Sequence, residues 1–401
     1  MDPRLRHRID QLRAQLAAQT GQPLAAVGIV RAPLRVALLG AHVDHQLGAA
    51  LGCALDQCVL LAFVPEPSGR VTLRSANFPG TVEFDLARLA ESRPPADDWG
   101  AYAHGAASAL AGAYPLSVGL TGLVAGSLPI GGLSSSAAVD VAYLLALQRV
   151  NGLDLDLAAN IALAQRAEGE GLGLRTGTLD QTLILAGRAG HLTHLDFARE
   201  TIDHLPHPPD RAFDLIIVHS GESRALVGSG YNERVGQCEE AARRLLAAAD
   251  LPVPARPRLG LVPADAYEAG LGALPAPLDR RARHFRDEVS RVREGAGEWA
   301  RGAFDRFGAL MAESGRSSLE QYESGSPALA SLHEVLNAAP GVWGARFCGA
   351  GFGGSAVALA DPAYREQVLA TIWREYTRAQ PELAARAQVC FASPAAGAEV
   401  W

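Results

Sequence analysis

Two histidines and an aspartate lie within four positions of the stretch "LLGAHVDHQLG", which covers residues 38–48. His42, Asp44 and His45 follow an apolar run, so they stand where a buried strand is expected to end. Imidazole and carboxylate groups can bind a metal ion, hydrogen bond to the hydroxyls of a sugar, or form an ordinary polar turn. The remaining motifs of the chain must distinguish these three possibilities.

A second candidate site is the glycine- and serine-rich stretch "LPIGGLSSSAAV" at residues 128–139. It leads into an apolar helix, whose first N–H groups have no partner and lie at the positive end of the helix dipole. Such a helix start binds anions, and a serine hydroxyl there can reach the Mg²⁺ that a nucleotide carries. The alternative is a serine that only caps the helix. The residues concerned are Gly131, Gly132, Ser134, Ser135 and Ser136.

A carboxylate follows a glycine-rich turn in "GLGLRTGTLDQ", residues 171–181. Gly177 permits close approach of a ligand to the backbone, and Asp180 can hold a substrate hydroxyl and accept its proton. On this segment alone, an aspartate that closes a loop through an Asx turn explains the pattern equally well. Asp180 is therefore expected on a short turn.

A third glycine-rich stretch, "FCGAGFGGSAVAL", covers residues 347–359 and lies between two apolar runs. Gly349 and Gly351 belong either to a tight hairpin or to a backbone that presses on a phosphate group. No dinucleotide-binding helix and distal acid follow, so the stretch is no dinucleotide fingerprint.

The composition excludes two large classes of phosphate chemistry. All 36 basic residues among the 401 are arginines, whereas a Walker P-loop and a protein kinase each need a lysine. Phosphate binding must therefore use backbone N–H groups, helix dipoles, arginine and a metal. The net charge of -7 and the absence of a basic stripe argue against nucleic acid, so a small-molecule partner is expected.

The cysteines and the apolar runs indicate a cytoplasmic protein. The five cysteines are odd in number and show no CxxC spacing, which argues against a disulfide framework or a zinc site. The amphipathic N-terminus lacks the apolar core of a signal peptide, and no apolar run reaches the length of a membrane span.

The periodicity predicts an α+β protein of two domains. Strands are expected at 26–39 and 57–64, a helix after the serines at 134–136, and another helix at about 156–170. The proline-rich stretch "HLPHPPDRAFD" at 204–214 is the best domain boundary, which gives domains 1–205 and 206–401. Strands and helices do not alternate strictly, so a purely βαβ arrangement is not expected.

The motifs, taken in order, resemble those of the GHMP small-molecule kinases. The order is "APLRVALLGAHVDH", "PIGGLSSSAA", "AEGEGLGLRTGTLDQ" and "FCGAGFGGSAVAL", and "WGAYAHG" with "GYNERVGQCEEA" resembles the galactokinase branch. The resemblance implies two domains with the active site in the cleft between them. It also implies ATP- and Mg²⁺-dependent phosphorylation of a sugar's anomeric hydroxyl, by a monomer or a homodimer.

The resemblance also implies roles for individual residues. Asp180 matches the catalytic aspartate, and Arg35 matches its partner at the transferred phosphoryl group. Ser136 and Glu168 match the metal-associated residues, and the phosphate loop runs from Gly131 to Ser136. The sugar-binding and adenine-binding positions fall on His42, Asp44, Gly177 and Tyr231, and on Trp99. The loop "PIGGLSSS" is one residue shorter than the usual pattern.

One departure from the galactokinase pattern concerns the sugar's C6. Galactokinases carry a glutamate there, where this chain has Ala41, so a repulsion of about 4 kcal/mol against a C6 carboxylate is absent. Arg175 replaces a common proline and either reaches that carboxylate or points to water. His45 replaces a tyrosine and can donate a hydrogen bond to the acid.

With these changes the chain resembles galacturonokinases, which make galacturonate 1-phosphate. The "HVDH" residues are accordingly interpreted as a sugar clamp. A metal site is not expected, because the sequence offers no third protein ligand at helical spacing. Two alternatives remain open: a galactokinase acting on galactose, and a non-catalytic sugar sensor on the same scaffold. Acceptance of glucuronate does not follow from the sequence.

Overall fold

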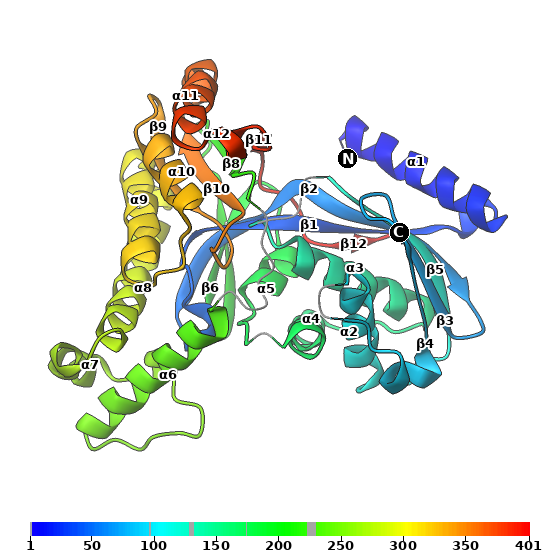
Figure 1. Cartoon of the computed structure of the whole chain (residues 1–401), viewed down its shortest axis with the longest axis horizontal. Coiled ribbons are helices and arrows are strands. Elements are labelled where there is room, and N and C mark those ends of the chain that lie inside the picture. Colours follow the sequence, from blue (N-terminus) through cyan, green and yellow to red (C-terminus); the bar gives the residue numbers. More distant parts are fainter. Residues whose placement is uncertain (1, 96–97, 128–131, 174, 223–229) are drawn as a thin grey trace.

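The computed structural model describes residues 2–95, 98–127, 132–173, 175–222 and 230–401. Gly131, which the resemblance places in the phosphate loop, lies outside these ranges. Within them the chain forms an eight-stranded sheet and a four-stranded sheet, with helices packed on both (Figure 1). The expected α+β class is confirmed.

The larger sheet is built on two long antiparallel strands, β1 (Gly28–Leu39) and β2 (Ala49–Glu66). The sheet order is β12-β1-β2-β5-β3-β4, and β6 pairs with both β2 and β7. The other strands are β3 (Arg70–Ser75), β4 (Thr81–Asp85), β5 (Gly119–Gly126), β6 (His191–Asp196), β7 (Thr201–Pro206) and β12 (Glu399–Val400). Nearly every residue of β1 is buried, because helices cover both faces of the sheet.

Helix α1 (Pro3–Thr20) lies on one face of this sheet and packs Ile9, Leu12 and Leu16 against it (Figure 1). The opposite face carries α2 (Gly100–Ala111), α3 (Ser135–Val150), α4 (Leu157–Leu172) and α5 (Leu179–Ala186). Helix α3 is rich in alanine and buried along most of its length, so it can approach the sheet closely. This position places its first turn beside β1.

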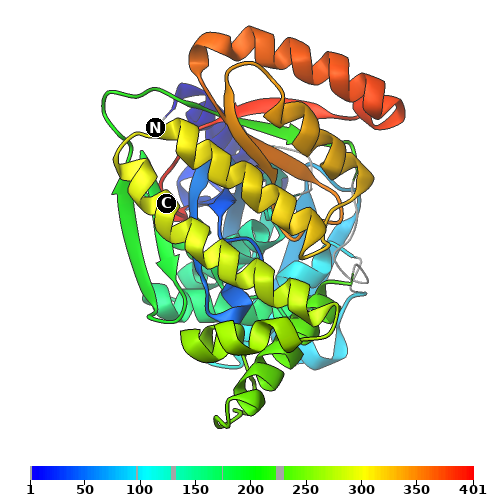
Figure 2. The same ribbon diagram turned by 90° about the vertical axis from the view of Figure 1, so that its left-hand side faces the viewer.

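The smaller sheet has the order β11-β8-β10-β9. Its strands are β8 (Asp214–His219), β9 (Val342–Phe347), β10 (Ser355–Ala360) and β11 (Gln388–Ala392). Helices α10 (Pro327–Asn337), α11 (Arg365–Ala379) and α12 (Pro381–Ala384) pack on it. A further layer contains α6 (Tyr231–Ala248), α7 (Ala264–Gly270), α8 (Leu278–Ala300) and α9 (Phe304–Glu320). Figure 2 shows α8 and α9 side by side.

Two local expectations are wrong. Asp180 lies in the first turn of helix α5 and not on a short turn, because the apolar residues after it pack inward over two helical turns. Strand β2 begins at Ala49, well before the expected start at residue 57, because its first residues pair with β1 and β6. Among the described helices, none is long and apolar enough to span a bilayer.

Candidate active site

A bidentate ion pair between Arg35 and Asp180 forms the centre of the site. Arg35 Nε donates to Asp180 Oδ1 at 2.6 Å, and Nη2 lies 2.6 Å from Oδ2. The hydroxyl of Ser134 also donates to Oδ2. The Arg35 side chain is 3% exposed, whereas that of Asp180 is 26% exposed. The carboxylate is therefore held in one orientation and remains accessible from the solvent side.

Local backbone features bring these groups together from distant parts of the sequence. The register of β1 against β2 shifts between Pro33 and Arg35, an irregularity that re-aims side chains. The Arg35 N–H donates to the carbonyl of Leu133 at 3.3 Å, which ties β1 to the segment before α3. Residues predicted from separate motifs thus meet at one place.

Asp44 reaches the start of α5 because Gly177 has no side chain. A Cβ at Gly177 would lie 2.1 Å from Asp44 Oδ2, and that oxygen accepts from the Leu179 N–H at 3.3 Å. Burial, with a smaller contribution from Asp180, raises the pKa of Asp44 to about 6. Glycine is needed at position 177 because a side chain there would collide with Asp44. This packing role is separate from any role in binding a ligand.

The first and third glycine-rich stretches lie against each other. Gly132 has φ +76°, and a Cβ there would lie 2.4 Å from the Ser355 nitrogen. Gly349 has φ +71° and approaches the Gly132 carbonyl. Gly351, at φ +80°, leaves no room for a Cβ beside the carbonyl of Ser324. Both stretches therefore depend on backbone contacts that only glycine permits.

The start of α3 has the properties expected of an anion site. Helix α3 begins at Ser135, and Ser134 at its N-cap makes no hydrogen bond from its side chain to the helix N–H groups. Its hydroxyl turns to Asp180 instead, and its backbone has φ +52°. The N–H groups of the first turn, where Ser135 and Ser136 lie, are consequently not capped by a serine.

Glu168 on α4 is a buried carboxylate beside this helix start. Its Oε2 accepts from Thr176 Oγ1 at 3.1 Å and from Gln181 Nε2 at 2.9 Å. Burial, with a smaller contribution from Asp180, raises the pKa of Glu168 to about 7. No group of three or more His, Cys, Asp or Glu suited to a metal occurs in the described ranges.

The two histidines of "HVDH" are hydrogen bonded to residues far along the chain. His42 has φ +57°, stacks on Tyr322 with ring centroids 4.1 Å apart, and lies 2.9 Å from Ser324 Oγ through Nε2. His45 lies 3.1 Å from the Tyr322 hydroxyl through Nε2 and 2.9 Å from Gln46 Nε2 through Nδ1. Burial lowers the pKa of His45 to about 3 and lowers that of His42 well below its ordinary value. Both rings are therefore expected to be neutral near pH 7.

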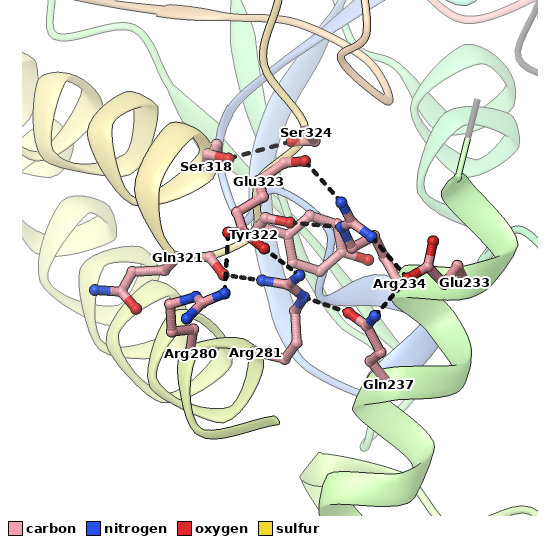
Figure 3. A network of polar contacts seen from close by, with 10 residues as sticks. All are labelled: Glu233, Arg234, Gln237, Arg280, Arg281, Ser318, Gln321, Tyr322, Glu323 and Ser324. Carbon is pink, nitrogen blue, oxygen red and sulfur yellow. Dashed lines mark hydrogen bonds and ion pairs between the residues drawn. The ribbon is translucent and has the colours of Figure 1, made fainter. Parts of the chain in front are cut away.

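A polar network holds Tyr322 and Ser324 in place (Figure 3). Arg281 extends from α8 to the carbonyl of Gln321 and the carboxylate of Glu323, while Arg234 on α6 donates to the Tyr322 carbonyl at 3.2 Å. Glu323 has φ +57°, a strained conformation for a residue with a side chain. No local signal in the sequence pairs residue 322 with residue 42, so this network could not be predicted.

The backbone of Ala41 is held from behind by a second buried network. The Ala41 N–H donates to Glu288 Oε1 at 3.0 Å, and its carbonyl accepts from His284 Nε2 at 2.8 Å. Although burial opposes ionisation of Glu288, Arg291 and other nearby cations lower its pKa to about 2. Ala41 is 4% exposed, so this position has a defined orientation.

The remaining expected site residues occupy three different settings. Tyr231 is the first residue of α6, is 7% exposed, and meets His45 edge-on at 6.2 Å. Arg175 Nη2 contacts both carboxylate oxygens of Glu239, and Arg175 lines an open cavity of about 440 Å³. Trp99 precedes α2, and its Nε1 lies 3.4 Å from the Pro79 carbonyl.

Comparison with known proteins identifies the family. Three family descriptions match: "GHMP kinases N terminal domain" at residues 101–188, "GHMP kinases C terminal" at 296–378, and "Galactokinase galactose-binding signature" at 16–65. A galacturonokinase of Arabidopsis thaliana is 39% identical over 397 residues, covering 94% of this chain and 93% of the relative. The galactokinase of Canis lupus familiaris is 34% identical, covering 87% of each.

Comparison with solved structures indicates the same family. The Lactococcus lactis galactokinase complexed with galactose has a TM-score of 0.89 at 28% identity, covering 98% of this chain and 99% of that one. A mevalonate kinase, at 15% identity and a TM-score of 0.60, shares the fold, covering 91% of this chain and 98% of that one. The protein therefore belongs to the GHMP kinase family and is a sugar kinase of the galactokinase branch.

Proposed function

We propose that this sugar kinase transfers the γ-phosphoryl group of ATP to the anomeric hydroxyl of D-galacturonate. The observation that carries the proposal is Ala41, a buried, well-oriented residue without charge at the position where galactokinases carry a glutamate facing C6. The galacturonokinase relative is also more similar to this chain than the Canis lupus familiaris galactokinase, at 39% against 34% identity.

Asp180 is proposed to align the anomeric hydroxyl and to accept its proton. Arg35 and Ser134 fix the carboxylate, so little reorganisation is needed during the reaction. Arg35 Nη1 is buried and has no hydrogen-bond partner among the described residues. It is therefore a donor available to an oxygen of the transferred group, and the first-turn N–H groups of α3 are available to the other phosphates.

The residues present fit a nucleotide-bound Mg²⁺. Ser136 and Glu168 are proposed to hold it, because a buried carboxylate and a serine in the first turn of α3 provide oxygen ligands of the kind Mg²⁺ prefers. When bound, such an ion neutralises charge on the phosphate oxygens.

The preference at C6 is an electrostatic argument about residue 41. Two carboxylates about 4 Å apart, at an effective dielectric of about 20, repel by about 4 kcal/mol, or about a thousandfold in affinity. Ala41 removes that repulsion. Arg175 Nη2 already contacts Glu239, and His45 already contacts Tyr322 and Gln46, so recognition of the acid by these atoms would compete with the present partners.

The direct test compares ATP-dependent turnover on galacturonate, glucuronate, galactose and arabinose. We expect galacturonate to have the highest kcat/KM. Ala41→Glu should lower kcat/KM for galacturonate by about a hundredfold or more, whereas the neutral, equally large Ala41→Gln should lower it far less. Equal losses in both variants would show that size and not charge acts at this position, and would refute the C6 argument.

The galactose-binding signature at residues 16–65 favours a second candidate, a galactokinase. That function predicts a higher kcat/KM for galactose than for galacturonate in the same assay. A sugar sensor predicts retained sugar binding without turnover on any of the four sugars.

A further inference from the structure

Asp140 is a buried carboxylate that the proposed mechanism does not use. It lies on α3 and is 1% exposed, and neither of its carboxylate oxygens has a hydrogen-bond partner among the described residues. A carboxylate removed from water is costly unless it is protonated, paired or bound to a cation. Its position in the fold distinguishes these possibilities.

The helix geometry directs Asp140 toward the expected cation site. Asp140 follows Ser136 by four residues, so both lie on the same face of α3. Side chains of a helix slant toward its N-terminus, so the Asp140 carboxylate is expected over the turn that begins the helix. Glu168, on the neighbouring helix α4, is the other buried acid that acts on it electrostatically.

Two buried carboxylates and a serine hydroxyl therefore surround the first turn of α3. Burial, and then the charge of Glu168, raises the pKa of Asp140 well above its ordinary value. The surrounding titratable groups, Tyr102 on α2 and Tyr143 on α3, are phenols and bring no positive charge. Glu168 is the charged group that acts on Asp140, whereas the cation of Arg35 acts on Glu168.

We propose that Asp140 is a positioning residue of the cation site and accepts hydrogen bonds from water ligands of the divalent ion held by Ser136 and Glu168. A water-mediated role fits the absence of a three-carboxylate cluster among the described residues, and Mg²⁺ usually keeps several waters. This inference rests on the proposed use of a Mg²⁺–nucleotide. Partners of this kind commonly change metal affinity by about 10- to 100-fold.

The test measures binding of Mn²⁺, by electron paramagnetic resonance, to protein saturated with a non-hydrolysable ATP analogue. Asp140→Asn keeps the shape and removes the charge, so the Mn²⁺ Kd should rise at least about tenfold. Affinity for the analogue without metal should stay unchanged. A neutral, protonated Asp140 predicts the opposite, an unchanged Mn²⁺ Kd, and that result would overturn the inference.

A matched control and a second variant keep the test decisive. Asp214 on β8 is also buried, but its carboxylate lies 2.6 Å from the guanidinium of Arg365. Asp214→Asn should therefore lower stability without changing the Mn²⁺ Kd. If Asp140→Asn does not fold, Asp140→Ser takes its place, and wild-type Mn²⁺ affinity in that variant overturns the inference. If the unaltered protein binds no Mn²⁺ with the analogue, the proposed function fails as well, which separates the two failures.

Discussion

At the scale of single residues, the chemistry depends on how firmly Asp180 is held. Three donor atoms, two from Arg35 and one from Ser134, fix a carboxylate that still faces solvent on one side. A positioned general base contributes about 10²- to 10⁴-fold to a rate. The residue must be both fixed and negatively charged to do this.

Asp180→Asn should therefore lower kcat by about 10²- to 10⁴-fold. Binding of a non-hydrolysable ATP analogue, measured by calorimetry, should change little, because the α3 N–H groups are untouched. Asp156 caps α4 at the surface, so Asp156→Asn is the matched control and should retain turnover. Undiminished turnover in Asp180→Asn would remove Asp180 from the mechanism.

Much of the residue-level site could be predicted from the sequence because ordered motifs specify it. Arg35, Asp180 and Glu168 lie within those motifs, and the structure brings them together around the start of α3. Tyr322 and Ser324 could not be predicted, because their contacts with "HVDH" join segments about 280 positions apart. The pairing of Arg175 with Glu239 likewise depends on a helix face that one sequence does not orient.

At the scale of elements, α8 positions the proposed sugar clamp, His42, Asp44 and His45, through the turn after α9. Arg281 is 1% exposed and bonds the turn at Gln321 and Glu323 (Figure 3). Tyr322 of this turn contacts both histidines. The same turn supports the third glycine-rich stretch, where the Phe352 N–H donates to the Ser324 carbonyl at 2.6 Å. One turn thus contacts both the histidines proposed to bind the sugar and the glycine-rich stretch proposed to bind phosphate.

Glu323→Gln should raise the sugar KM by about tenfold while leaving the KM for ATP nearly unchanged, because small displacements of binding groups are costly. The loss of stability should be only about 1 kcal/mol, since the carboxylate is 39% exposed. Steady-state kinetics and urea unfolding measure the two effects. Glu240 pairs only with surface arginines, so Glu240→Gln should change neither KM. Equal changes in the two KM values would contradict a role specific to the sugar.

The pattern of strands and helices was predictable where one period dominates, as in β1 and α3. Helix α5 was missed because it has only 8 residues and begins in a glycine-rich turn, so its period is too short to recognise. The start of β2 was missed because glycine and alanine dominate it, and its strand character comes from pairing with β1 and β6.

At the scale of the whole molecule, buried neutral histidines couple folding to pH. Burial lowers the pKa of His45 from 6.5 to about 3, so the unfolded chain binds a proton at this residue that the folded chain does not. The stability that depends on neutral His45 is fully present above about pH 6.5 and is lost as the pH falls toward 3.

His45→Gln should reduce, by about one, the number of protons that the chain takes up on unfolding. The slope of unfolding free energy against pH, measured with urea between about pH 6 and 4, should fall by about 1.4 kcal/mol per pH unit. His7 is exposed on α1, so His7→Gln is the matched control and should keep the original slope. An unchanged slope in His45→Gln would show that His45 is not the group responsible.

Strand β12 connects the last residues to the strand that carries Arg35. Val400 pairs with Val30, the backbone of Trp401 exchanges hydrogen bonds with Ile29, and Arg31 donates to the Ala396 and Gly397 carbonyls. A nascent chain in which residues 399–401 are still inside the ribosome therefore lacks the strand that pairs with one edge of β1, the strand that bears Arg35. Strand β1 acquires its neighbour β12 only after these residues have left the ribosome.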